Sequence, residues 1–378
     1  MLTRMQICCL WLLISFGNHA LAATDCAMQT DIPQSQCQAL VDLYHSTSGA
    51  NWSIDGGDWN VTNAPCSWTR VTCSGNVVTE INLYSSHLTG TLPNSLVNLT
   101  GLTYLGLSGN QLTGTIPTLP TGLTWLDLSF NQLTGTIPTL PIGLIGLNLF
   151  FNQLTGTIPT LPTGLTGLGL SHNQLTGTIP TLPTGLTGLY LSYNQLTGTI
   201  PTLPTGLTGL YLSHNQLTGT IPTLPTGLIR LDLSYNQLSG IVPDLPLGLT
   251  YMNLRGNQQL EKTNCATQTD IPQSQCQALV DLYNSAGGEN WFNTIFSTLN
   301  FMENSSYSVL YNWNVTNTPC SWTGVTCNGN VVTKIILFYS DLTGMLPNSL
   351  VNLTGLTELD LHNNQLTGTI PTLPIEAV

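Results

Sequence analysis

A unit of 21 residues recurs eight times in succession, from Leu102 onward, in this chain of 378 residues. The copy that begins at Gly206 reads Gly-Leu-Thr-Gly-Leu-Tyr-Leu-Ser-His-Asn-Gln-Leu-Thr-Gly-Thr-Ile-Pro-Thr-Leu-Pro-Thr. A constant spacing of this length predicts a stacked solenoid, in which each repeat contacts only its neighbours. Corresponding positions of successive repeats then form long rows on one surface. The function of such a chain depends on what these rows display.

Residues 207–212 predict a short strand, because Leu210 and Leu212 point to one side and Gly209 and Tyr211 to the other. We expect the leucine side to form the core and the other side to form a display face. Two prolines in residues 221–225 predict an extended, polyproline-like return on the outer arc. Nine strands are expected in a first array, residues 78–260, with repeats that begin at Val78, Leu102, Leu123, Leu144, Leu165, Leu186, Leu207, Leu228 and Leu249.

An asparagine follows each predicted strand where the chain turns inward. A buried amide must bond backbone groups, because an unsatisfied buried polar group costs roughly 1–3 kcal/mol. Stacked copies would therefore form an asparagine ladder at Asn110, Asn131, Asn152, Asn173, Asn194, Asn215, Asn236 and Asn257.

The chain contains a duplicated module. Residues 26–44 reappear almost unchanged at 265–283, and the second copy carries a 15-residue insertion within 292–312, which we expect to be a surface loop. We predict an N-terminal cap at 23–77, a second cap at 261–331 and an array of two strands at 332–378, which is either naturally short or truncated. Each cap opens with a helix, since Cys37, Leu40, Val41 and Tyr44 follow a helical spacing. Asp31 and Pro33 are the start signals of this helix.

Residues 1–22 resemble a secretory signal, with an apolar run of about ten residues before Ala20-Leu21-Ala22. We expect export, and no later apolar stretch is long enough to span a membrane. Eight cysteines remain in the mature chain, four in each cap. An oxidising compartment favours disulfides, and four cysteines allow three pairings. Zinc binding is the weaker interpretation, because no Cys-x-x-Cys occurs.

Composition and motifs exclude several functions. A net charge of −12 with six Lys and Arg argues against nucleic acid as a partner. We find no phosphate loop, nucleophile elbow or other catalytic motif, and so predict no enzyme and no cofactor. Asp127 and Asp232 lie about 24 Å apart in the expected stacking and are interpreted as solvated. His172 and His214, about 10 Å apart, are too distant to share a metal ion and are interpreted as surface histidines.

Three columns of side chains line the predicted display face. The column just before the asparagine reads Gly109, Phe130, Phe151, His172, Tyr193, His214, Tyr235 and Gly256. A second column reads Asn82, Gly106, Asp127, Asn148, Gly169, Tyr190, Tyr211, Asp232 and Asn253. The third holds Tyr104, Trp125, Arg230 and Tyr251 around a centre of Gly146, Gly167, Gly188 and Gly209, which we expect to be a shallow trough.

The pattern Leu-x-x-Leu-x-Leu-x-x-Asn-x-Leu, at about 78–260 and 332–366, resembles the leucine-rich repeat family. The Leu-Thr-Gly-Thr-Ile-Pro segment and the motif of residues 66–73 are similar to the plant-type subclass and its N-terminal cap, whereas Leu-Pro-Thr-Gly-Leu is similar to short repeats of bacterial effectors. We therefore expect a bacterial chain of mixed type. The resemblance implies a horseshoe or superhelix with short parallel strands on its concave face. It also implies the disulfides Cys26–Cys37, Cys66–Cys73, Cys265–Cys276 and Cys320–Cys327.

The resemblance to plant receptor ectodomains and to secreted inhibitors implies recognition rather than turnover. Our hypothesis is a secreted, non-enzymatic scaffold that binds a protein, or a glycan as the weaker choice, along the face formed by residues 104–251. Polar aromatic rings suit such binding, because they bury much area for little side-chain entropy. Two alternatives stay open. The protein is a structural or adhesive surface element, or the aromatic column packs against itself and contacts no ligand.

Overall fold

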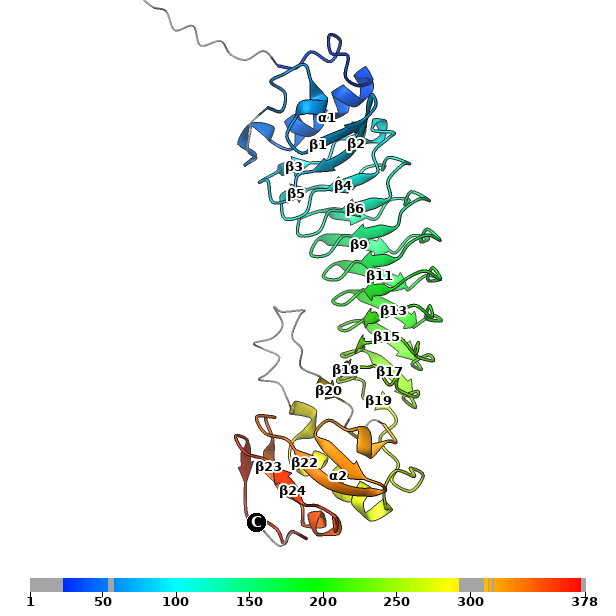
Figure 1. Cartoon of the computed structure of the whole chain (residues 1–378), viewed down its shortest axis with the longest axis vertical. Coiled ribbons are helices and arrows are strands. Elements are labelled where there is room, and N and C mark those ends of the chain that lie inside the picture. The colour runs from blue at the N-terminus through cyan, green and yellow to red at the C-terminus, as the bar shows by residue number, and fades with distance from the viewer. Residues whose placement is uncertain (1–22, 54–57, 292–308, 312, 315, 375–378) are drawn as a thin grey trace, which may run out of the picture.

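The protein forms an elongated, curved stack of coils with a helical cap near each end (Figure 1). This description rests on a computed structural model that describes residues 23–53, 58–291, 309–311, 313–314 and 316–374. The predicted signal segment, 1–22, lies outside the described residues. The predicted repeat solenoid, with short parallel strands and disulfide-bonded caps, is confirmed.

A long sheet forms the concave side, one short strand from each coil. Each strand, with a leucine or other apolar residue at its centre, pairs in parallel with the strand of the next coil, so that Leu168 lies between Leu147 and Leu189. The strands follow an antiparallel first strand, β1 (Val71–Ser74), and are β2 (Val77–Asn82), β4 (Tyr104–Gly106), β6 (Trp125–Asp127), β8 (Gly146–Asn148), β10 (Gly167–Gly169), β12 (Gly188–Tyr190), β14 (Gly209–Tyr211), β16 (Arg230–Asp232) and β18 (Tyr251–Asn253).

A second parallel sheet lies after the asparagine turn, where we had predicted no strand. Each of its central strands reads Gln-Leu-Thr-Gly-Thr, with the leucine buried and the glutamine exposed. We call this sheet the threonine sheet. Its strands are β7 (Thr134–Thr136), β9 (Gln153–Thr157), β11 (Gln174–Thr178), β13 (Gln195–Thr199), β15 (Gln216–Gly219), β17 (Gln237–Gly240) and β19 (Gln259–Leu260). A matching pair, β3 (Thr89–Thr91) and β5 (Gln111–Thr113), precedes it.

The core between the two sheets is a continuous apolar column. Leucines of every coil, such as Leu186, Leu189 and Leu191, are fully buried, and Ile200 closes the turn that follows the threonine sheet. This column runs from the first cap to Leu260. Because one repeat buries too little apolar surface to offset the ordering of its backbone, stability depends on the interfaces between coils.

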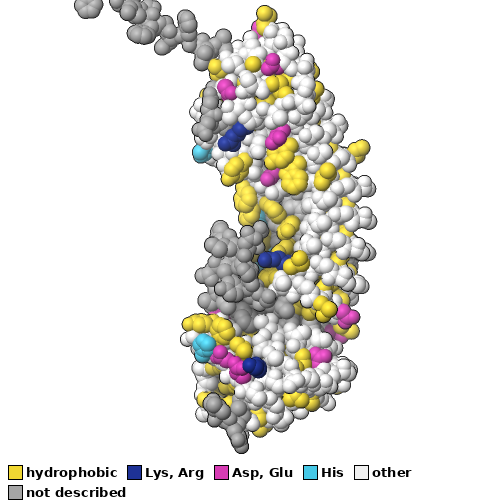
Figure 2. Space-filling view, viewed as in Figure 1, with side chains coloured by type: hydrophobic (Ala, Val, Ile, Leu, Met, Phe, Trp, Pro, Cys, Tyr) yellow, Lys and Arg dark blue, Asp and Glu magenta, His cyan; other side chains and the backbone are white. Residues whose placement is uncertain are grey.

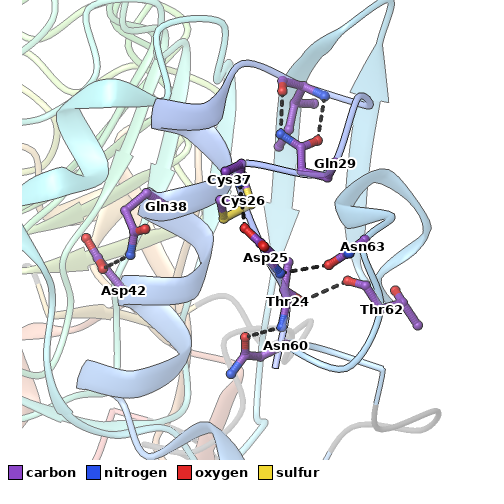
Figure 3. Close-up of a disulfide and its surroundings, with 12 residues drawn as sticks. Thr24, Asp25, Cys26, Gln29, Cys37, Gln38, Asp42, Asn60, Thr62 and Asn63 are labelled. Atoms are coloured by element: carbon purple, nitrogen blue, oxygen red, sulfur yellow. Dashed lines mark hydrogen bonds between the residues drawn. A yellow bond between two sulfur atoms is a disulfide. The ribbon is translucent and has the colours of Figure 1, made fainter. Parts of the chain in front are cut away.

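The first cap covers the N-terminal end of this column. Its helix α1 (Gln34–Ser46) buries Cys37, Leu40 and Val41, as the helical spacing predicted. Tyr44 is only half-buried, whereas Leu43, which the spacing did not include, is buried. Figure 3 shows the disulfide Cys26–Cys37, which fastens the preceding segment to this helix. A second disulfide, Cys66–Cys73, ties η2 (Pro65–Ser67) to β1. Asp31 makes no cap bond with α1. Its carboxylate instead accepts a hydrogen bond from the backbone N–H of Cys66.

Five further short 3-10 helices belong to the first module or its copy. In the first module, η1 (Gly49–Asn51) follows α1 and η3 (Asn94–Asn98) packs beside it. In the second module, η4 (Gly288–Asn290) follows the second helix, α2 (Gln273–Ser285). The remaining copies are η5 (Pro319–Ser321) and η6 (Asn348–Asn352).

The second module repeats this plan around a separate core. The disulfides Cys265–Cys276 and Cys320–Cys327 are both present. Its strands are β21 (Val325–Asn328), β22 (Val331–Ile336) and β24 (Glu358–Asp360) in one sheet, with β23 (Thr343–Met345) and β25 (Gln365–Thr367) in another.

Part of the insertion is not a loop, contrary to our expectation. Residues 309–311 form strand β20 (Val309–Tyr311), which pairs in parallel with β18 of the first array. The rest of the predicted loop, residues 292–308 and 312, lies outside the described residues. An open edge strand exposes unpaired backbone groups, so this added strand satisfies the backbone at the end of the first concave sheet.

Candidate functional site

The side chains of the asparagines that follow the concave strands form hydrogen bonds with backbone groups, as a stacked asparagine ladder requires. The side-chain amide of Asn194 donates to the carbonyls of Leu170, Leu191 and Ser192 at 3.0, 3.1 and 3.4 Å. Its carbonyl oxygen accepts the backbone N–H of Leu175 at 3.0 Å. Each asparagine thus joins its own coil to the preceding one and fixes the turn that follows the concave strand.

The residue before six of the eight asparagines carries a ring and has a left-handed backbone conformation. We call the six consecutive rings the ring column: Phe130, Phe151, His172, Tyr193, His214 and Tyr235. Their φ angles lie between 50° and 56°. Such a conformation costs a side chain about 1–2 kcal/mol, which explains why glycine occupies the same position at Gly109 and Gly256.

The ring column packs against itself. Phe151 and His172 stack with ring centroids 4.0 Å apart, and His172 and Tyr193 follow at 4.3 Å. Burial lowers the pKa of the His172 imidazole, and the nearby His214 lowers it further. Burial also lowers the pKa of His214. These histidines are therefore stacked and half-buried, rather than the plain surface residues that we expected.

The glycines of the concave sheet lie mostly beneath neighbouring rings, which corrects the predicted open trough. A Cβ added to Gly146 would meet the Trp125 ring at 2.3 Å, and one added to Gly188 would meet the Tyr190 ring at 2.8 Å. Because these glycines lack a side chain, the rings lie down on the sheet and bury apolar area. Gly167 differs, since a Cβ there would meet no heavy atom within 4 Å.

An aromatic platform of three rings lies to one side of this position, where Tyr190 covers Gly188, the lateral neighbour of Gly167. Tyr190 and Tyr211 stack with centroids 5.0 Å apart, and Phe150 contacts Tyr190 edge to face at 5.8 Å. Phe150 reaches Tyr190 across Gly169, whose added Cβ would lie 2.8 Å from the Phe150 ring. Our sequence reasoning missed Phe150. The available signal was its replacement of the serine found in other coils, as at Ser129 and Ser171.

Charges flank the platform at both ends. Asp127 accepts hydrogen bonds from the backbone N–H and the hydroxyl of Ser129 at 3.0 and 2.6 Å. Asp232 binds Ser234 in the same way, and burial raises the pKa of its carboxyl against the opposing effect of these bonds. Both carboxylates are half-buried and bonded, which corrects their interpretation as solvated. Arg230 lies on the same strand as Asp232.

The remaining site predictions lie on the same concave sheet. Asn148 pairs laterally with Asp127 and Gly169. Tyr104 precedes Trp125 in the third column, and burial followed by the charges of Asp127 and Glu80 raises the pKa of its hydroxyl. Tyr251 pairs with Arg230 at the other end. The face in Figure 2 shows hydrophobic side chains gathered on the concave edge, below the first cap.

Within the described ranges, no group of three or more His, Cys, Asp or Glu side chains is placed to hold a metal ion. No helix among the described residues is long and apolar enough to cross a membrane.

Two family models match the chain. The model "Leucine rich repeat N-terminal domain" matches residues 33–74 and 272–328. The model "Leucine Rich Repeat" matches 101–123, 122–144, 185–207, 206–228, 227–249 and 355–374. Together with the fold, these matches show leucine-rich repeats and two leucine-rich repeat N-terminal domains in this chain. The chain is homologous to the ectodomains of plant receptor kinases.

The similar proteins are much longer than the matched segments. A probable leucine-rich repeat receptor-like protein kinase of Arabidopsis thaliana is 46% identical over 67 residues, which cover 18% of this chain and 10% of the kinase. The receptor protein kinase WSS1 of Oryza sativa subsp. japonica is 60% identical over 42 residues, covering 11% of this chain and 5% of the kinase. These relatives are plant proteins, so our expectation of a bacterial chain is unsupported.

Solved structures share the solenoid fold. A plant ice-binding protein matches with a TM-score of 0.52 and 24% identity, covering 91% of each chain. A TDR receptor matches with a TM-score of 0.47 and 26% identity, covering 77% of this chain and 48% of the receptor.

Proposed function

We propose that this chain is a secreted, non-enzymatic recognition protein that binds an extended polypeptide along its concave sheet. The observation that carries the proposal is the uncovered position at Gly167 of β10, which lies between Gly146, covered by the Trp125 ring, and Gly188, covered by the Tyr190 ring of the aromatic platform. Rigid rings around one open position offer an apolar side chain a contact surface on several sides. Aromatic anchors of this kind contribute most of the binding energy in many protein interfaces.

The surroundings of the platform favour a ligand whose central part is neutral. Between Asp127 and Arg230 the sequence contains no Asp, Glu, Lys or Arg. Three strand spacings of about 4.8 Å place Trp125 roughly 14 Å from Tyr190 along the stack, a span of about four extended residues. The ligand's charged groups would then meet Asp127 at one end of this span and Arg230 or Asp232 beyond the other.

The homology to receptor ectodomains supports recognition rather than catalysis. A glycan is the weaker ligand, since most rings of the ring column and the aromatic platform are stacked on one another, so that a neighbouring ring covers their faces. Few ring faces are left to stack on sugar. Adhesion without a specific ligand is the alternative function, and it requires no particular residue of the platform.

The test uses peptides selected from a displayed random library on the full chain, with affinities measured by calorimetry. Gly167→Leu places a side chain in the open position, where its Cβ meets no heavy atom within 4 Å, and we expect it to weaken binding at least about tenfold, or 1.4 kcal/mol. The double variant Tyr190→Ala and Tyr211→Ala should lose binding as well. The matched control, Gly185→Leu, also points into open space but lies outside the concave strands. Equal affinities of the Gly167 and Gly185 variants would refute this site.

A further inference from the structure

The threonine sheet presents a repeated pattern of exposed side chains on a surface separate from the concave face. In β9, β11 and β13 the leucine is buried, while the glutamine and the second threonine are exposed. The first threonine is exposed or half-buried, and the glycine between the two threonines is half-buried. Each strand thus offers three polar side chains at steps of two residues, or about 6.7 Å.

Lateral pairing extends this pattern across the sheet. Thr178 of β11 lies beside Thr197 of β13, and Thr197 lies beside Gln216 of β15. Thr157 lies beside Thr176 in the same way. Adjacent strands are about 4.8 Å apart, so the side chains form a regular two-dimensional array.

Neighbouring coils hold both threonines of each strand in place. The hydroxyl of the first threonine donates to a glycine carbonyl of the preceding coil, as from Thr176 to Gly156 at 3.3 Å. The methyl group of the second lies against a glycine of the next coil, since a Cβ added to Gly198 would meet the Thr178 methyl at 2.8 Å. Threonine is branched at Cβ and has few rotamers. The array is therefore ordered before any partner arrives, which lowers the entropy cost of binding.

The concave face and the threonine sheet differ in how much their residues vary among the repeats. The concave positions have diverged, with Trp125, Gly146 and Arg230 in one column. The second threonine of the sheet is unchanged in five successive coils, at Thr136, Thr157, Thr178, Thr199 and Thr220. The fold does not require it, because the next coil carries Ile241 at this position and retains its strand, β17. Exposed threonines also recur outside the two sheets, as at Thr160, Thr181 and Thr202, so the repeats keep threonine on their outer surface while the concave positions differ.

The chemistry of the array restricts its partner. Residues 128–229 contain no Asp, Glu, Lys or Arg, so the array offers nothing to a charged surface. The strands β9, β11 and β13 contain no aromatic residue, so they offer no ring on which a sugar could stack. What the array does offer is hydroxyl groups that accept and donate hydrogen bonds, alternating with methyl groups, at fixed spacings.

We propose that the threonine sheet is a binding surface for ice. Ice is neutral, flat and periodic, and its oxygen rows repeat at a spacing close to that of β-strands. Ordered threonine hydroxyls can take the places of water molecules in such a row, and the methyl groups between them exclude mobile water. Many weak contacts, all made at once by one rigid surface, add up to tight adsorption.

The test measures thermal hysteresis and the shape of a single ice crystal in a solution of the full chain. We expect faceted crystals and a gap between melting and freezing temperatures. Thr178→Tyr places a ring in the middle of the array and should abolish both effects. Gln195→Tyr, at an exposed position of the same sheet, should abolish both effects too. It keeps the proposal testable if the Thr178→Tyr variant does not fold. Circular dichroism verifies that each variant is folded.

The matched control is Thr184→Tyr, an exposed threonine outside both sheets, which should retain full activity. The concave variants Tyr190→Ala and Tyr211→Ala should retain it as well, so that this surface and the polypeptide site are tested separately. Rounded crystals at high protein concentration would overturn the proposal. So would equal losses in Thr178→Tyr and Thr184→Tyr, or depletion of the chain by crystalline cellulose without any effect on ice.

Discussion

Asn194 shows how much of the stack depends on one side chain. Its four hydrogen bonds satisfy three buried carbonyls and one buried N–H in two successive coils. Asn194→Ala would leave these groups without partners, and each buried orphan costs about 1–3 kcal/mol. We predict a loss of at least about 3 kcal/mol in the free energy of unfolding, measured by urea denaturation.

The neighbouring Gln195 is the control for this prediction. It is exposed on the threonine sheet, and Gln195→Ala should change stability by no more than about 0.5 kcal/mol. Similar losses for the two variants would show that the asparagine bonds contribute no more than an exposed amide.

The ring column makes stability depend on pH through His172 and His214. Burial lowers the pKa of both below the value of 6.5 for a free imidazole. The unfolded chain therefore binds protons before the folded chain does, so that stability is complete above about pH 6.5 and falls as the pH drops through the folded pKa values. The variant His172→Phe with His214→Phe keeps the rings and removes the protons.

We predict that the melting temperature of the parent falls more between pH 7.5 and pH 5 than that of this double variant. Carboxylates elsewhere titrate equally in both proteins, so the difference isolates the two imidazoles. Identical pH profiles would contradict the prediction.

Sequence reasoning placed residues in columns correctly but not the directions of their rings. The columns follow from the alternation of side chains along each strand and from the constant length of the repeat. The observed strand register agrees with them. Whether Trp125 stands upright or lies over Gly146 depends on the absence of a side chain in the adjacent coil. Phe150 was not predicted, because its position holds serine in other coils and only its neighbour Phe151 belongs to the ring column. The directions of the rings are decided by packing between coils, and the sequence of a single repeat does not contain this information.

Glycine at the centre of each threonine strand explains why this sheet was missed. Gly177 has φ of 77°, and glycine within a short segment normally argues against a strand. Here the left-handed glycine also makes room for the methyl group of Thr157, which would lie 2.8 Å from a Cβ at this position. Strand pairing between identical coils then holds a segment that would not form a strand alone.

Gly177→Ala therefore combines backbone strain with a clash. We predict a loss of about 1–2 kcal/mol from the φ angle, with an added loss from the displaced threonine. Urea denaturation measures it. Gly185→Ala is the matched control, because its Cβ enters open space, and we expect no loss of stability there. If both alanines were tolerated equally, the glycine of the threonine strand would have no structural role.

The two modules are joined but have separate interiors. The buried residues of the first core end at Leu260, and those of the second begin at Cys265. The described links between them include the pairing of β18 with β20 and a hydrogen bond from the N–H of Glu261 to the carbonyl of Gly240. Backbone hydrogen bonds at one sheet edge couple the unfolding of the two modules less strongly than a shared apolar core would. Each module should therefore unfold as its own cooperative unit.

Leu279→Ala tests this independence. Leu279 is fully buried in the second core, and its truncation should cost about 2–5 kcal/mol there. We predict that hydrogen exchange, followed by mass spectrometry, becomes faster in residues 265–291 and 316–366 and stays unchanged in 102–233. Residues 251–253 should exchange somewhat faster, because β20 belongs to the destabilised module and its pairing protects their backbone. Leu189→Ala, the matched truncation in the first core, should give the opposite pattern. Faster exchange throughout the chain in either variant would mean that the two cores unfold together.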